Sequence, residues 1–70
     1  MVKPGDLVRY AWSQAVGLVL EVARDENSGR VILLVEWPQW YAEEMNAKSR
    51  KWWTREDRFL IKLGKETSSG

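Results

Sequence analysis

Residues 30–37 read Arg-Val-Ile-Leu-Leu-Val-Glu-Trp and are followed directly by Pro38. Five consecutive aliphatic residues, three of them β-branched, favour a strand, and the lack of polar alternation predicts that both of its faces are covered. Pro38 has no backbone N–H to donate to a sheet, so the strand is expected to end there. This stretch therefore predicts the central strand of a β domain, with Leu33 in its core.

Four shorter segments around this strand have the length and composition of strands. They are residues 7–12, 17–23, 50–54 and 59–63. In the first of them, Val8, Tyr10 and Trp12 share one face. In the second, the alternation places Leu18, Leu20 and Val22 on the face that is expected to be buried, with Glu21 on the other.

Turn residues separate these segments. Residues 3–6, Lys-Pro-Gly-Asp, predict a tight turn before the first strand. Residues 24–29, Arg-Asp-Glu-Asn-Ser-Gly, predict a hairpin loop, and the charged residues 55–58 suit one more tight turn.

Residues 39–49 leave two interpretations open. Tyr41 and Met45 lie four residues apart, and Glu44 precedes Lys48 at the spacing that favours an ion pair on a helix. Eleven residues are nevertheless few for a stable helix, so a long loop is the alternative to a helical turn.

Composition restricts the possible functions. Seventy residues make one domain, which is near the smallest size that folds without crosslinks. The domain is expected over residues 1–64, followed by a flexible tail at 65–70. Cysteine and histidine are absent, which excludes disulfides, thiolate zinc sites and histidine bases. Neither a membrane-spanning run nor a signal peptide is visible, so a cytoplasmic protein without membrane or metal partners is expected.

Five short strands without a long helix predict an all-β protein, and a closed barrel best removes exposed strand edges. The order of the segments resembles that of small SH3-like barrel proteins of tailed phages and marine viral sequence collections. The resemblance covers about residues 3–63 and is carried by Gly5-Asp6-Leu7-Val8, Gly17, Glu36-Trp37 and Leu60-Ile61-x-Leu63.

This resemblance implies a small five-stranded SH3-like barrel of unknown function, located in the host cytoplasm if the protein is viral. Where the family usually has a tight turn, this chain has the longer segment 38–49 between the third and fourth strands. A long loop or helical turn is expected there, and it is a natural place for a specialised contact surface, because binding residues tend to lie on loops held by a rigid scaffold.

Five tryptophans are the most unusual part of the composition. Each offers a large apolar area and one N–H that needs a partner. Trp37 is expected in the core, Trp53 is open between core and surface, and the other three are expected to be exposed. Alternation along residues 50–54 predicts that Trp52 and Trp53 point to opposite sides. The candidate binding surface consists of Trp12, Trp40, Tyr41, Arg50, Lys51, Trp52 and Arg55. Such a surface suits stacked bases, a proline-rich peptide or an enclosed cation.

We therefore expect a non-enzymatic binding or adaptor module that contacts an unknown protein partner, or a second copy of itself, through aromatic side chains. The alternative is single-stranded nucleic acid, held by the tryptophans and the basic segment 48–58. That segment has five basic residues against Glu56 and Asp57, while the whole chain carries a net charge of only +1. No cofactor and no catalytic residues are expected. A catalytic carboxylate pair needs a cleft that shifts the pKa of one carboxyl away from that of the other, and so small a barrel has little room for such a cleft.

Overall fold

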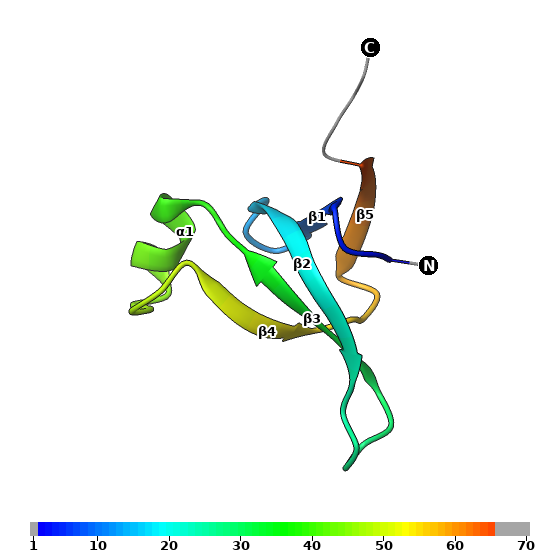
Figure 1. Ribbon diagram of the computed structural model, residues 1–70. Helices are drawn as coiled ribbons and strands as arrows, with labels where there is room; N and C mark the ends of the chain where they lie inside the picture. The colour runs from blue at the N-terminus through cyan, green and yellow to red at the C-terminus, as the bar shows by residue number, and fades with distance from the viewer. Residues whose placement is uncertain (1, 66–70) are drawn as a thin grey trace.

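The computed structural model describes residues 2–65, which form a single antiparallel sheet and one short helix (Figure 1). The elements are β1 (Asp6–Tyr10), β2 (Val16–Arg24), β3 (Val31–Glu36), α1 (Gln39–Glu44), β4 (Lys51–Arg55) and β5 (Leu60–Lys65). Across the sheet the strands lie in the order β4-β3-β2-β1-β5. The predicted all-β class with five strands is confirmed. The expected closure of the sheet is not, because β4 and β5 do not pair with each other and remain its edge strands.

Proline and asparagine set the limits of the segment between β3 and β4. Pro38 ends the strand as predicted and is also the N-cap of α1. The helix is six residues long, and the chain leaves it through Asn46, whose φ of 57° lies in the left-handed region that often terminates helices. The segment is thus a helical turn followed by a loop. Because α1 ends at Glu44, the predicted spacing to Lys48 does not place the two on one helical face.

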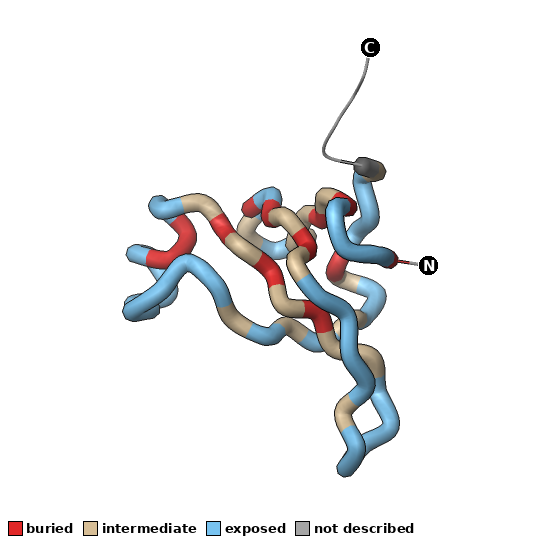
Figure 2. The backbone as a smooth tube through the Cα atoms, viewed as in Figure 1, coloured by how far each residue is buried: buried red, intermediate tan, exposed pale blue. Residues whose placement is uncertain are grey.

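The core lies on the concave side of the sheet. Leu33 and Val35 of β3 are completely buried, as is Val8 of β1. Trp37 is only 2% exposed, and the ring of Tyr41 from α1 packs beside it. Figure 2 shows buried positions in red along β3 and on α1. The predictions that Leu33 and Trp37 belong to the core are confirmed.

The predicted buried face of β2 is wrong. Val19 is buried, whereas Leu18 and Leu20 are partly exposed and Val22 is 38% exposed. Two local features decide which side chains of β2 face the core. Gly17 lies against the core, where an added Cβ would come within 2.8 Å of the Trp37 ring, so Leu18 lies on the outer side opposite Glu36. Beyond Val19 the pairing with β3 shifts by one residue, a β-bulge at Leu20, and Val22 then lies on the inner side opposite Leu33.

Two strand ends also differ from the sequence prediction. β1 ends at Tyr10, and the chain turns through residues 11–13 before Gln14 adopts a φ of 65°. Trp12 therefore lies on a turn and does not share a strand face with Val8 and Tyr10. At the other end of the chain, β5 extends to Lys65, and the remainder of the predicted tail, residues 66–70, lies outside the described residues.

The predicted turn at residues 3–6 is confirmed and holds the one buried charge among the described residues. Gly5 has a φ of 94°, and the backbone N–H of Asp6 donates to the Lys3 carbonyl at 3.1 Å. The Asp6 carboxylate accepts from the Lys3 backbone N–H at 2.9 Å and lies 3.5 Å from Lys62 Nζ. That backbone hydrogen bond, assisted by Lys62, lowers the pKa of Asp6 below its ordinary value, against the opposing effect of burial.

Within residues 2–65, no helix is long and apolar enough to cross a membrane.

Candidate functional site

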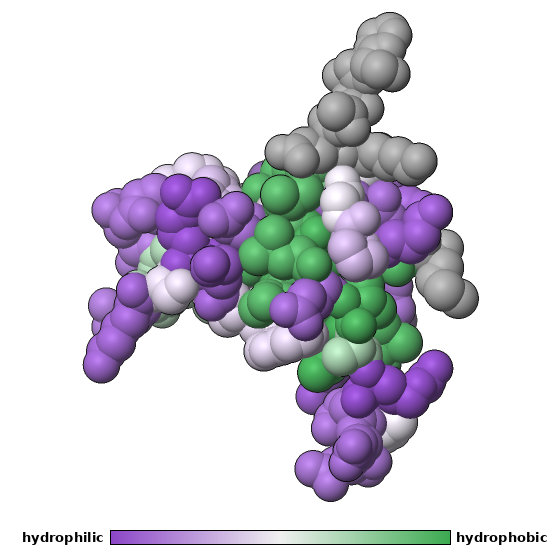
Figure 3. All heavy atoms as spheres, in the orientation of Figure 1, coloured by the Kyte–Doolittle hydropathy of each residue, from purple (hydrophilic) through white to green (hydrophobic). Residues whose placement is uncertain are grey.

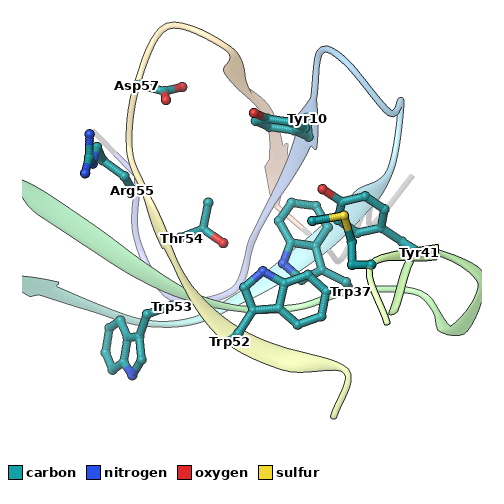
Figure 4. Close-up of a pocket in the computed structure, with 9 residues that line it drawn as sticks. Tyr10, Trp37, Tyr41, Trp52, Trp53, Thr54, Arg55 and Asp57 are labelled. Carbon is teal, nitrogen blue, oxygen red and sulfur yellow. The ribbon is translucent and has the colours of Figure 1, made fainter. Parts of the chain in front are cut away.

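An aromatic concavity with a volume of about 380 Å³ lies between β1, α1 and β4 (Figure 4). Its apolar lining comes from Tyr10, Trp37, Tyr41, Met45 and Trp52. Trp53, Thr54, Arg55 and Asp57 border its other side, and the side chains of Trp53 and Arg55 point away from it in Figure 4. This is the place in the described structure where aromatic side chains from distant parts of the sequence converge around an open space.

The aromatic wall is held in place by its own packing. The centroid of the Trp37 ring lies 5.1 Å from that of Tyr41, in an edge-to-face arrangement, and 6.0 Å from that of Trp52. The Tyr41 and Trp52 centroids are 5.7 Å apart. These separations are typical of favourable aromatic pairs, so the three rings form a preformed surface that needs little ordering on binding.

Alternation along β4 decides which tryptophan belongs to the concavity. Trp52 pairs with Val35, a buried core residue, and therefore lies on the inner side. Trp53 pairs with Leu34, its ring points away from the other aromatics in Figure 4, and it is 46% exposed. The prediction that the two point to opposite sides is confirmed. The expectation that Trp52 is exposed is corrected, because it is partly buried against the core.

Two polar atoms at the base of the concavity lack a hydrogen-bond partner among the described residues. They are the indole nitrogen of Trp37 and the hydroxyl oxygen of Thr54, both buried. In Figure 4 the Thr54 hydroxyl faces the same space as the nitrogen-bearing edges of the Trp37 and Trp52 rings. Because an unsatisfied buried donor is costly, a hydrogen-bond acceptor that reached these two atoms would be favourably bound.

The charges around the concavity nearly balance. Arg55 and Asp57 lie on the same side of it, and no other charged side chain lines it among the described residues. Arg50, which the sequence placed in the candidate surface, is engaged elsewhere. Its Nε donates to the Trp37 carbonyl at 3.1 Å, and its guanidinium lies 3.6 Å from the Glu36 carboxylate.

The structure thus brings together only part of the predicted surface. Tyr41 and Trp52 line the concavity, although Tyr41 is just 6% exposed. Arg55 borders it, but its side chain is turned to the outer side of β4, where Arg55 pairs with Ile32. Trp12 is 73% exposed and packs on Phe59, at a centroid separation of 5.5 Å, away from the concavity. Trp40 is exposed on α1, and Lys51 lies on the outer side of β4 opposite Glu36.

Sequence reasoning left Tyr10, Met45 and Thr54 out of the candidate surface. A usable signal existed for Thr54, because it lies two residues from Trp52 on the same strand and must share its face. No spacing signal placed Tyr10 there, since β1 and β4 are not neighbours in the sheet and both reach the concavity only because the sheet bends.

No family model, no curated protein and no solved structure matches this chain. Within residues 2–65, no group of three or more acidic side chains is arranged to hold a metal ion.

Proposed function

We propose that this chain is a small SH3-like barrel that acts as a non-enzymatic binding module, and that its aromatic concavity holds an extended, proline-containing segment of a partner protein. The observation that carries the proposal is the preformed wall of Trp37, Tyr41 and Trp52 next to hydrogen-bond donors without partners.

The strand arrangement supports the SH3-like barrel. β1 pairs with both β2 and β5, so the last strand lies beside the first in a bent antiparallel sheet. The segment that departs from the family's tight turn contributes Tyr41 and Met45 to the concavity. The departure from the pattern therefore helps to build the proposed site. A phage origin rests on the resemblance alone.

A proline-containing segment matches the chemistry of the lining. Proline rings pack well on flat aromatic surfaces, and proline has no N–H of its own, so the extended peptide offers mainly carbonyl acceptors. The indole N–H groups of Trp37 and Trp52 and the hydroxyl of Thr54 are the donors on the protein side. A volume of about 380 Å³ is at the low end for ligand sites, so only a few peptide residues fit.

Single-stranded nucleic acid is less well supported by the same contacts. Phosphates need cations that are not already paired, but Arg50 is committed to Glu36 and Arg55 shares its side of the concavity with Asp57. Catalysis is not part of the proposal, because the buried carboxylate Asp6 is engaged by Lys3 and Lys62 and does not line the concavity.

The test uses the indole N–H signals of the five tryptophans in a proton–nitrogen NMR spectrum of the labelled protein. The probes are a panel of short peptides with two P-x-x-P repeats and varied flanking residues, matched peptides with alanine in place of proline, and a single-stranded oligonucleotide. We expect the proline peptides to shift the Trp37 and Trp52 signals and to leave the Trp12 signal unchanged, with the alanine peptides inert.

Trp12→Ala serves as the control variant, since Trp12 is the most exposed tryptophan and lies outside the concavity. It should bind like the parent, whereas Tyr10→Phe, which removes one hydroxyl at the rim, should bind more weakly. Shifts caused by the oligonucleotide and abolished by salt would replace the peptide proposal with the nucleic-acid one. Silence of the Trp37 and Trp52 signals with every peptide would refute the proposal.

A further inference from the structure

The edge of β4 carries backbone groups that the sheet leaves open. β4 pairs with β3 in one unbroken register, and no strand of the described chain pairs with its other edge. The Glu56 N–H donates to the Val31 carbonyl at 3.1 Å, which makes these two residues a hydrogen-bonded pair next to β4. Because bonded and non-bonded pairs alternate in an antiparallel ladder, the backbone groups of Lys51, Trp53 and Arg55 point away from β3.

Most of these outward groups have no hydrogen-bond partner. The Lys51 N–H donates to Ser49 Oγ at 3.1 Å. The Lys51 carbonyl and both backbone groups of Trp53 and Arg55 make no hydrogen bond within residues 2–65. Such a row of donors and acceptors is a template on which another extended chain can pair.

The opposite edge of the sheet, on β5, is less suited to pairing. The register between β5 and β1 shifts between Leu7 and Val8, and Gly64 of β5 has a φ of 126°, far from an extended conformation. Irregularities of this kind bend a strand and blunt its edge. An added strand can follow the regular β4 over its length but not β5.

The side chains beside the open backbone groups are basic at both ends. Lys51, Trp53 and Arg55 are all exposed on the outer side of β4. Neither Lys51 nor Arg55 forms an ion pair in the described part of the chain, and Glu36, which lies opposite Lys51, is engaged by Arg50. An added strand therefore meets a positive charge on each side of Trp53.

These charges disfavour a second copy of β4 as the added strand. If two β4 strands paired antiparallel with Trp53 opposite Trp53, Lys51 of each copy would lie opposite Arg55 of the other. Like charges directly opposite each other are destabilising in a sheet, whereas opposite charges stabilise it. The edge thus favours an acidic partner over itself.

Trp53 adds an apolar contact between the two charges. It pairs with Leu34 of β3 and is 46% exposed. Figure 3 shows apolar side chains gathered over β1, β2 and β3 on the viewed side, between hydrophilic groups at α1 and at the β2–β3 hairpin. An apolar residue of the added strand that packs on the Trp53 ring would lose water from both side chains.

We propose that the edge of β4 binds an extended acidic segment of a partner protein as an additional strand. Side chains two residues apart share one side of a strand, so the pattern acidic-x-apolar-x-acidic places its carboxylates beside Lys51 and Arg55 and its apolar residue beside Trp53. Nucleic acid matches this edge less well, because phosphates offer only acceptors and the edge presents both donors and acceptors. The ligand also differs from that of the concavity, since proline has no N–H for the ladder.

The test follows the backbone N–H signals of the nitrogen-labelled full chain in a proton–nitrogen NMR spectrum. The probe is the end-blocked peptide T-E-T-V-T-E-T. We expect it to shift the backbone signals of Trp53 and Arg55 and the indole signal of Trp53. The indole signal of Trp37 reports on the concavity, so failure of this proposal can be distinguished from failure of the proline-peptide proposal.

Methylation of single peptide nitrogens separates strand addition from attraction of charge alone. In the paired strand, the N–H of the central valine donates to the Trp53 carbonyl, and methylating it should weaken binding about tenfold. The N–H of the next threonine points away from β4, so methylating that nitrogen should leave binding unchanged. Equal effects of the two methylations overturn the proposal.

Charge reversal tests the predicted sequence of the partner. Lys51→Glu combined with Arg55→Glu should weaken binding of the acidic peptide at least tenfold and should create binding of T-K-T-V-T-K-T. The matched control is Arg30→Glu with Lys48→Glu, which makes the same change of charge at exposed positions outside β4 and should bind like the parent. Each variant is first shown to keep the parent's near-ultraviolet circular dichroism.

Three results overturn the proposal. The first is an absence of shifts at Trp53 with the acidic peptide, and the second is an equal loss of binding in the two double variants. The third is a shift of the same signals by single-stranded oligo-dT but not by the peptide, which would assign the edge to nucleic acid.

Discussion

Replacing Thr54 by Val removes a buried hydroxyl that has no hydrogen-bond partner and retains the shape of the side chain. Thr54 pairs with Leu33 on the inner side of β4, and its oxygen is buried. A buried hydroxyl without a partner costs about 1–3 kcal/mol, and the added methyl group packs against the same core. We therefore expect Thr54→Val to raise the free energy of unfolding by about 1 kcal/mol or more. In a domain of this size that corresponds to a rise in melting temperature of about 4–8 °C.

Most core substitutions destabilise, so a stabilising outcome is a demanding test. Thermal unfolding followed by tryptophan fluorescence measures it, and Thr54→Ser, which keeps the hydroxyl but loses the methyl group, is the matched control and should melt below the parent. The same Thr54→Val variant should bind the proline peptides more weakly, because it loses a donor to the ligand. A Thr54→Val protein that melts below the parent would show that the hydroxyl has a partner, and the argument for an acceptor-bearing ligand would lose one of its two supports.

Three further predictions concern the core and the buried carboxylate of Asp6. Leu33→Ala should lower the free energy of unfolding by about 2–5 kcal/mol in urea titrations, since Leu33 is completely buried, and a variant that unfolds like the parent would remove β3 from the centre of the core. Gly17→Ala should lower the free energy of unfolding by at least the roughly 1–3 kcal/mol typical of an overpacked core, because the new Cβ would meet a Val35 methyl group and the Trp37 ring, both buried. An unchanged urea midpoint would contradict this packing. Asp6→Asn should destabilise the protein at pH 7. Because the pKa of Asp6 is lowered in the folded state, its contribution is present above the unfolded pKa of about 3.9 and is lost as the pH falls further. The difference in urea midpoint between parent and variant should therefore shrink below about pH 4, and a constant difference would contradict the assignment.

Local chemistry explains which parts of the candidate site the sequence could predict. The segment after Pro38 was expected to add a contact surface, and α1 does contribute Tyr41 to the concavity. Period-two alternation correctly separated Trp52 from Trp53. Alternation cannot tell which of two adjacent tryptophans faces the core, and that was decided by the pairing of Trp52 with Val35 across β3 and β4.

By itself, the sequence determined the element types and their order. Turn residues, the proline after β3 and the aliphatic run from Val31 to Val35 act through local backbone geometry and burial, so five strands and a short intervening segment could be predicted. Only the tertiary structure decided the phase of β2, because the close approach at Gly17 and the bulge at Leu20 depend on β3 and Trp37. The same long-range packing bends the sheet, gathers the aromatic side chains on its inner side and leaves the leucines of β2 on its outer face.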